Sequence, residues 1–217
     1  MGHGAWTTAK SRVAVSPFYA GHGIMFYRFA YYIVKLLSLI FFPYTVIGKE
    51  NIPPGGGCIF ASNHLSNLDP LMIGLCAYRK TTYLAKDTLF KNKILGTILR
   101  WCEAFPIRRG ESDVRAIREC MRRLKKGLPV VVFPEGTRQR QDSEIQAEEG
   151  IGFLAARAGV PVVPVKVFGT DKVMPPKSRW LKRHPITLTF GEPLTFQGER
   201  DYKKIANEIM WAIRDIG

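Results

Sequence analysis

The stretch from Cys58 to Leu75, CIFASNHLSNLDPLMIGL, combines an apolar segment, a polar loop and the start of a second apolar segment. Its first residues, Cys58 to Ala61, follow a cluster of prolines and glycines, which predicts a buried strand. We expect Asp69 at the N-cap of the helix that follows, with Pro70 at its first position. His64 therefore lies on a strand-to-helix loop, where α/β proteins commonly place their sites.

His64 and Asp69 are close enough in sequence for the carboxylate to fold back onto an imidazole nitrogen. An imidazole held in this way is an oriented general base, which can take a proton from a hydroxyl group. A simpler interpretation fits the same spacing, in which Asp69 only caps its helix and His64 is a polar loop residue. Spacing alone does not separate these two interpretations.

Strands and helices are expected to alternate along the rest of the chain, without repeats or low-complexity segments. The expected strands are 44–48, 58–61, 82–85, 104–107, 129–133, 160–167 and 186–190. Two expected helices follow caps at 69 and 113, and three others begin at 95, 143 and 202. This order predicts an α/β fold with a largely parallel central sheet flanked by helices. Pro161 and Pro164 favour an edge or irregular position for strand 160–167.

The chain of 217 residues is long enough for one α/β domain and a short appendage. Its 32 Lys and Arg residues against 18 Asp and Glu residues give a formal net charge of +14, which indicates an anionic partner. Nucleic acid is disfavoured, since no helix-turn-helix, zinc or RNA-recognition signature is present. The 4 cysteines lack zinc-type spacing and scaffold density, so we expect free thiols in a reducing compartment and no metal.

No cleavable signal peptide is expected among the first residues, and residues 24–42 form a long apolar and aromatic segment. Arg28, Tyr31, Tyr32 and Lys35 share one helical stripe, opposite a set of apolar residues that would enter the acyl region: Phe26, Phe29, Leu36, Leu37, Ile40 and Phe41. This pattern favours a helix lying in the membrane interface. A membrane span is disfavoured because a lysine near mid-bilayer costs about 2.5 to 3.5 kcal/mol, and a soluble core helix is the remaining alternative.

Three further motifs follow NHLSNLD along the chain: FPIR (Phe105 to Arg108), PEGTR (Pro134 to Arg138) and VPVVPV (Val160 to Val165). Together, these four motifs resemble those of the glycerolipid acyltransferase family, which is typified by the enzymes that acylate 1-acylglycerol 3-phosphate to phosphatidic acid. The resemblance covers roughly residues 48 to 195. It implies that His64 and Asp69 are the catalytic dyad of an HX4D motif.

The resemblance also implies a site for the phosphate of the acceptor. Its members are Lys86, Arg108 and the EGTR residues Glu135, Gly136, Thr137 and Arg138. Two roles stay open at this point: Lys86 also fits a solvated helix-end lysine, and Glu135 fits an orienting contact to Arg138, an acceptor for a substrate hydroxyl or a structural salt bridge. Cys102 and the Glu148-Glu149-Gly150 segment depart from the family, which usually has glycine and lysine there.

The implied activity is O-acyl transfer from acyl-CoA or acyl carrier protein to the free hydroxyl of a lysophospholipid, above all 1-acylglycerol 3-phosphate, without cofactor or metal. Another lysolipid or hydroxylated lipid acceptor, or a non-catalytic basic membrane-binding protein, are the alternatives. We expect a membrane-associating helical segment at 1–47 and an acyltransferase domain at 48–217. The protein is expected at the cytoplasmic face of an anionic bilayer, monotopic or peripheral.

Overall fold

The structure is a computed structural model that describes residues 41–107, 114–136, 147–175 and 180–216, and residues 29, 31–33, 35, 36 and 38 of an N-terminal helix. The strands are β1 (Tyr44–Ile47), β2 (Ile59–Ser62), β3 (Thr82–Lys86), β4 (Ala104–Ile107), β5 (Val130–Val132), β6 (Val162–Phe168) and β7 (Ile186–Phe190). The helices are η1 (Lys49–Asn51), α2 (Asp69–Cys76), η2 (Asp87–Lys91), α3 (Lys93–Trp101), α4 (Val114–Lys125), α5 (Glu149–Ala158), α6 (Thr170–Val173) and α7 (Tyr202–Asp215).

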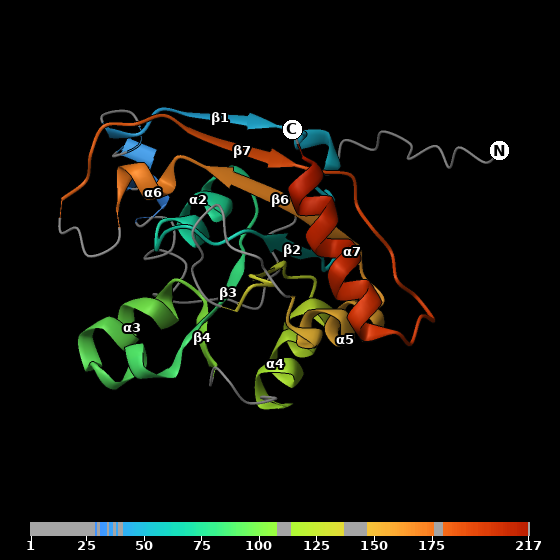
Figure 1. Cartoon of the computed structure of the whole chain (residues 1–217). Coiled ribbons are helices and arrows are strands. Elements are labelled where there is room, and N and C mark those ends of the chain that lie inside the picture. The colour runs from blue at the N-terminus through green and yellow to red at the C-terminus, as the bar shows by residue number, and fades with distance from the viewer. Residues whose placement is uncertain are drawn as a thin grey trace.

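The strands form one seven-stranded sheet in the order β1-β7-β6-β2-β5-β3-β4 (Figure 1). Of the neighbouring pairs, β6 and β7 are antiparallel and the others are parallel. The expected fold class, an α/β fold with a largely parallel sheet flanked by helices, is thereby confirmed. The near-continuous apolar strands agree with this, because a parallel sheet is covered on both faces.

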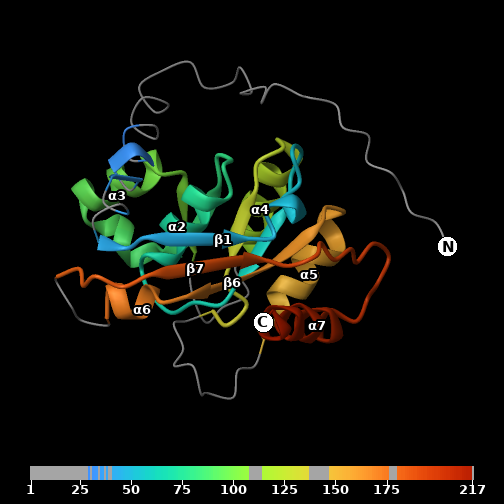
Figure 2. The ribbon, with the colours of Figure 1, turned by 90° about the horizontal axis from the view of Figure 1, so that it is seen from above.

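Each face of the sheet has its own buried core, because successive strand residues point to opposite faces. Phe60 and Val131 pack with the buried residues of α2. Their neighbours Ile59 and Val130 pack with the buried residues of α4, α5 and α7. Figure 2 shows α2 and α3 on one side of β1, β7 and β6, and α5 and α7 on the other.

Of the edge or irregular position expected for residues 160–167, the edge position is wrong, because β6 lies inside the sheet between β7 and β2. The two prolines of this segment lie at positions where β6 needs no N–H group for its pairing with β2 or β7. Pro161 precedes the strand, and Pro164 lies one residue before the first pair with β7, Val165 and Phe190. The carbonyl of Pro164 faces β7, where it accepts a hydrogen bond from the N–H of Gly191. Its missing N–H falls on that same side, so no bond to β2 is lost.

Helix α5 begins at Glu149, later than the predicted start at Ser143. Ala147 and Glu148 precede it, and residues 143–146 lie outside the described part of the chain. Glu148 has extended backbone angles, and its N–H donates to the carbonyl of Pro134. That bond ties the start of α5 to the turn after β5.

The N-terminal helix is described only in part, so most residues on which its membrane role was predicted lie outside the described ones. Phe29, Tyr32 and Leu36 are exposed. Phe41 packs against the core, whereas the stripe pattern places it in the acyl region. The next segment, β1, already pairs with β7. Among the described residues, none of the helices has the length and apolar character needed to cross a membrane.

Candidate active site

The predicted motifs meet at one edge of the sheet. Strands β2, β5, β3 and β4 are neighbours and run parallel, so their carboxyl ends lie together. His64 comes three residues after Ala61 of β2, and Glu135 comes three residues after Val132, the partner of Ala61 in β5. Lys86 and Ile107 end β3 and β4 as a pair. This edge is the usual position of sites in α/β sheets.

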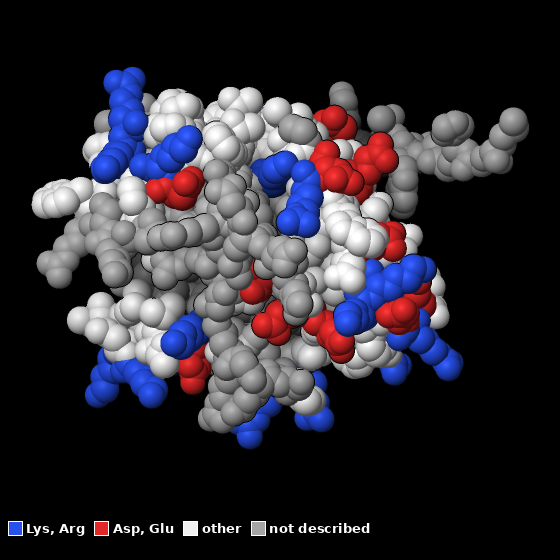
Figure 3. Space-filling model, in the orientation of Figure 1, with Lys and Arg blue, Asp and Glu red and all other residues white. Residues whose placement is uncertain are grey.

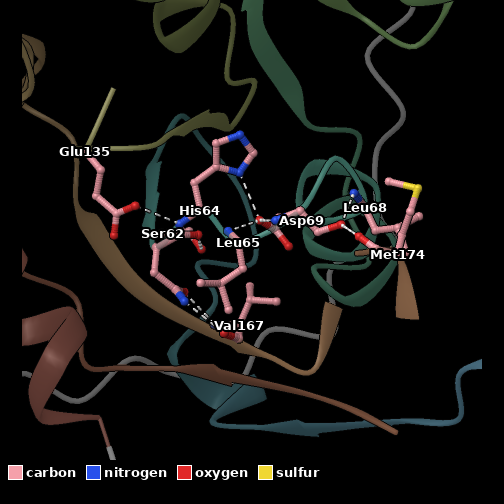
Figure 4. A network of polar contacts seen from close by, with 10 residues as sticks. Ser62, His64, Leu65, Leu68, Asp69, Glu135, Val167 and Met174 are labelled. Carbon is pink, nitrogen blue, oxygen red and sulfur yellow. Dashed lines mark hydrogen bonds and ion pairs between the residues drawn. The ribbon is translucent and has the colours of Figure 1, made fainter. Parts of the chain in front are cut away.

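His64 and Asp69 form a close buried pair. The Nδ1 atom of His64 lies 2.9 Å from Oδ2 of Asp69, and the two residues are only 6% and 0% exposed. In Figure 4 the second ring nitrogen points away from Asp69. With Nδ1–H donating to the carboxylate, Nε2 carries the lone pair that can accept a proton from a substrate hydroxyl.

Asp69 does not cap α2, contrary to the prediction. The N-cap position is taken by Leu68, and Asp69 is the first helical residue, without a capping bond. Its carboxylate points back into the loop, where Oδ2 also accepts hydrogen bonds from the backbone N–H groups of Leu65 (2.6 Å) and Ser66 (2.7 Å). The interpretation of Asp69 as a helix cap is therefore wrong, and its carboxylate organises the histidine loop.

Two side chains of the same loop anchor it to β6 and to the segment after α6. The amide of Asn63 donates to the carbonyl of Val167 (2.9 Å) and accepts from its N–H (2.7 Å). The hydroxyl of Ser66 donates to the carbonyl of Met174 (3.2 Å). The sequence assigned no role to Asn63 or Ser66. The position of Asn63 directly after a buried strand could have indicated this role, since a buried side-chain amide needs a hydrogen-bond partner.

The segment after β5 supports His64 from two directions. The ring of Phe133 stacks on the imidazole, with centroids 4.0 Å apart and planes 20° apart. The carboxylate of Glu135 accepts a hydrogen bond from the backbone N–H of His64 at 3.2 Å (Figure 4). This contact with the histidine backbone differs from the three roles that the sequence left open for Glu135. The stacking of Phe133 was also missed.

The environment of Glu135 favours its neutral form. Burial raises the pKa of its carboxyl to about 7, and the nearby charge of Asp69 acts in the same direction. The hydrogen bond from His64 and the charge of Arg214 lower the pKa, but by less than burial raises it. The site therefore holds one carboxylate, on Asp69, that orients the imidazole, and a second carboxyl group whose charge changes near neutral pH.

The other predicted site residues are only partly described. Gly136 has a φ of 65°, a left-handed backbone conformation that other residues rarely adopt, so this turn favours glycine. Lys86 is exposed at the end of β3. Arg108, Thr137 and Arg138 lie outside the described residues. The structure thus brings His64, Asp69 and Glu135 together.

Three of the four cysteines are core residues. Cys58, Cys76 and Cys120 are buried free thiols, and burial raises the pKa of each to about 12. Thiolates, which are the nucleophilic form, are therefore scarce at neutral pH. The expected burial of Cys58 is confirmed, since it lies in the core beside α2, but it precedes β2, which begins at Ile59.

Comparison with known proteins agrees with this geometry. A model of the Acyltransferase family matches residues 43–167. The chain is 31% identical over 170 residues to the 1-acyl-sn-glycerol-3-phosphate acyltransferase of Bacillus subtilis, which covers 77% of this chain and 82% of that protein. It is 32% identical over 164 residues to a chloroplast 1-acyl-sn-glycerol-3-phosphate acyltransferase of Brassica napus, covering 72% of this chain and 47% of the relative. The chain thus spans about half the length of that plant relative.

The fold is also shared with a solved structure. The crystal structure of the 1-acyl-sn-glycerophosphate acyltransferase from Thermotoga maritima superimposes with a TM-score of 0.71 at 27% identity, and the match covers 88% of this chain and 77% of that one. The matched family region contains the buried histidine loop and the turn after β5 that supports it. On these grounds, the chain belongs to the acyltransferase family.

Proposed function

We propose that the protein is an O-acyltransferase that moves a fatty acyl group from a thioester donor to the free hydroxyl of 1-acylglycerol 3-phosphate, producing phosphatidic acid. The observation that carries the proposal is the buried contact of 2.9 Å between Nδ1 of His64 and Oδ2 of Asp69 at the carboxyl edge of the sheet. The printed names of the relatives in Bacillus subtilis and Brassica napus support the choice of acceptor.

In the proposed reaction, Nε2 of His64 takes the proton of the acceptor hydroxyl as its oxygen attacks the thioester carbonyl carbon. The charge of Asp69 stabilises the imidazolium that forms, and the bonds from Leu65 and Ser66 hold the carboxylate in place. When the tetrahedral intermediate collapses, the carbon–sulfur bond breaks and the thiolate takes the proton back from His64. The oxygen–acyl bond is then complete, and no covalent acyl-enzyme is needed.

Recognition of the acceptor phosphate is proposed to rest on Lys86, Arg108 and Arg138, together with Gly136 and Thr137 of the EGTR motif. An exposed Lys86 at the site edge supports this, because a charged side chain there is free to meet an anion. Arginine suits phosphate because its planar guanidinium donates two parallel hydrogen bonds. The net charge of +14 has the sign that such an anionic substrate needs.

The setting proposed for this reaction is the cytoplasmic face of a membrane, with the protein monotopic or peripheral. Residues 1–47 are proposed to associate with the anionic bilayer, and the domain that follows to meet acyl-CoA or acyl carrier protein as acyl-donor substrate, without a cofactor or metal. Exposed Phe29, Tyr32 and Leu36 support the first point, since apolar side chains on a helix surface favour an apolar partner.

The test is to incubate the purified chain in detergent with labelled acyl-CoA, or acyl carrier protein, and a panel of lysolipids with and without a phosphate headgroup. We expect acyl transfer to 1-acylglycerol 3-phosphate, and a loss of roughly 10² to 10⁴-fold in the matched His64→Ala variant. Transfer only to phosphate-free acceptors would favour another lysolipid or hydroxylated lipid. No transfer with any donor would favour a non-catalytic basic membrane-binding protein.

A further inference from the structure

Helix α3 presents apolar side chains to solvent. A surface helix normally turns its apolar stripe toward the core and its polar residues outward. In α3, Ile94 is 76% exposed, Ile98 39% and Trp101 43%. Their spacing of four and three residues places them on one stripe of the helix, and the exposed Leu95 widens it. The apolar stripe of α3 therefore points away from the protein.

The side of α3 that faces the protein is narrow. Gly96 is the one buried residue of this helix, all of whose residues are described. A Cβ atom there would lie 2.9 Å from the carbonyl oxygen of Phe90, so glycine lets α3 rest directly on η2. Leu99 completes the contact by packing against the core beside α2. Gly96 and Leu99 thus attach α3 to the protein, and the exposed apolar stripe takes no part in this attachment.

Positive charge borders this stripe. Lys91, Lys93 and Arg100 are exposed, and α3 contains no acidic residue. The carboxylate of Glu103, just after the helix, is occupied by ion pairs with Lys80 (2.8 Å) and Arg123 (3.1 Å). Figure 3 shows a mostly uncharged surface at the position of α3, at the lower left, with basic side chains along its lower edge. An apolar stripe with a basic border matches an anionic lipid surface.

We propose that α3 is a bilayer-contact helix, separate from residues 1–47, which inserts Ile94, Ile98 and Trp101 at the boundary between headgroups and acyl chains. Lys91, Lys93 and Arg100 reach back to the lipid phosphates, as basic side chains do at membrane surfaces. The 9 residues of α3 extend only about 13 Å, so the helix lies in the interface and does not cross it.

This contact has a consequence for the site, and to that extent it rests on the proposed function. Helix α3 follows β3, whose carboxyl end belongs to the edge that carries His64. The described residues of the N-terminal helix lie at the same end of the molecule as α3 in Figures 1 and 2. A bilayer held by both helices would lie beside that edge, so a lysolipid acceptor would reach the site without crossing water.

The native Trp101 allows a direct test. One full-length variant keeps only this tryptophan (Trp6→Phe, Trp180→Phe, Trp211→Phe), and a matched variant keeps only Trp211, which is 59% exposed on α7, across the sheet. Each is bound to anionic vesicles whose acyl chains carry bromine. We expect brominated chains to quench Trp101 at least about twofold more than Trp211. Equal quenching, or no quenching of Trp101 in vesicle-bound protein, would overturn the proposal.

A second variant separates the bilayer from other occupants. Ile94→Asn with Ile98→Asn in the Trp101 protein should remove most of the quenching, while circular dichroism shows the fold to be retained. If Trp101 stays unquenched and the chain instead forms a dimer that these substitutions dissociate, the stripe is a self-association face and the proposal fails. The quenching is measured without substrates, so the test of the α3 contact does not depend on whether acyl transfer is detected.

Discussion

The carboxyl group of Glu135 is almost fully buried, and its pKa of about 7 lies above the ordinary value of 4.5. The unfolded chain therefore loses this proton at lower pH than the folded protein does. The stability linked to Glu135 is fully present below pH 4.5 and is lost as the pH rises to about 7. Over this window, the free energy of unfolding should fall by about 3 kcal/mol because of this group.

Glu135→Gln tests this linkage, because glutamine keeps an oxygen that can accept the N–H of His64 but carries no charge. We expect equal stabilities for variant and parent at pH 4, and a variant more stable by up to about 3 kcal/mol at pH 8. Urea unfolding at both pH values measures the difference. Asp69, Arg214 and His64 face Glu135 in both proteins, so a difference that does not change with pH would contradict the prediction.

The same site gives a catalytic control. Glu135→Ala removes the acceptor and leaves the buried N–H of His64 without a partner, which typically costs about 1 to 3 kcal/mol. We expect Glu135→Ala to lower kcat while Glu135→Gln retains most of it at pH 7, as a group that positions His64 requires. An equal loss in both variants would mean that the charge of Glu135, and not its hydrogen bond, matters to the reaction.

Arg108 and Arg138 are predicted to bind the acceptor phosphate, and replacement of either by lysine tests this at single side chains. Lysine keeps the positive charge but loses the planar fork of two parallel hydrogen bonds. We expect the KM for the lysolipid acceptor to rise more than the KM for the acyl donor. Steady-state kinetics with each substrate varied in turn decides, and equal rises in both values would speak for a role in binding the donor phosphates.

The sequence predicts the His64–Asp69 pair because both residues lie in one short motif, and the three further motifs along the chain give it the resemblance to an HX4D dyad. The contacts from Phe133 and Glu135 escape prediction because they join residues about 70 positions apart, as in the 71-residue separation between His64 and Glu135. Such contacts depend on the order of β2 and β5 in the sheet, which no local pattern specifies. The N-cap expected at Asp69 fails for a different, local reason: its carboxylate accepts the N–H groups of Leu65 and Ser66 in the loop before the helix.

Helices α5 and α7 approach each other through a glycine. A Cβ atom on Gly152 would lie 1.9 Å from the carbonyl oxygen of Tyr202, so the two helices must separate to admit any side chain. We expect Gly152→Ala to lower the free energy of unfolding by about 1 to 3 kcal/mol, because overpacking in a tight contact forces backbone shifts. Urea denaturation measures this change.

Gly150, in the first turn of the same helix, is the matched control. A Cβ atom there meets nothing within 4 Å, and alanine is the better helix former. We expect Gly150→Ala to leave stability unchanged or to raise it by up to about 1 kcal/mol. If Gly152→Ala were as stable as Gly150→Ala, the close approach of α5 and α7 would not limit the size of the side chain at position 152.

Most elements follow from local patterns, whereas their neighbours in the sheet do not. The last strand and the last helix begin at the predicted residues, Ile186 and Tyr202. Strand β6 has the expected residues, yet its prolines suggested an edge, because a lone sequence does not reveal which side of a strand needs its N–H groups. Likewise, Glu148 is excluded from α5 by its bond to Pro134, a contact that depends on the turn after β5.

The molecule as a whole carries a charge of +14 and exposes a group of apolar side chains on the helix before β1 and another on α3. Both features favour attachment to one anionic surface, with the catalytic edge held beside it. A true span near the N-terminus would instead place the first residues on the opposite side of the membrane from the sheet. The two arrangements differ in the position of the N-terminus, which can be measured directly.

We expect the N-terminus to lie on the same side of the membrane as the catalytic domain. The test introduces Ala5→Cys into a Cys102→Ser background, because the other cysteines, Cys58, Cys76 and Cys120, are buried and should not react. In sealed inverted vesicles, a membrane-impermeant maleimide should label this cysteine without detergent, as fully as Lys203→Cys on the exposed surface of α7. Arg28 and Lys35 would then reach headgroups from one stripe while neighbouring apolar residues enter the acyl region. Labelling at Ala5→Cys that appears only after detergent is added, with Lys203→Cys labelled throughout, would establish a membrane span and refute the in-plane arrangement.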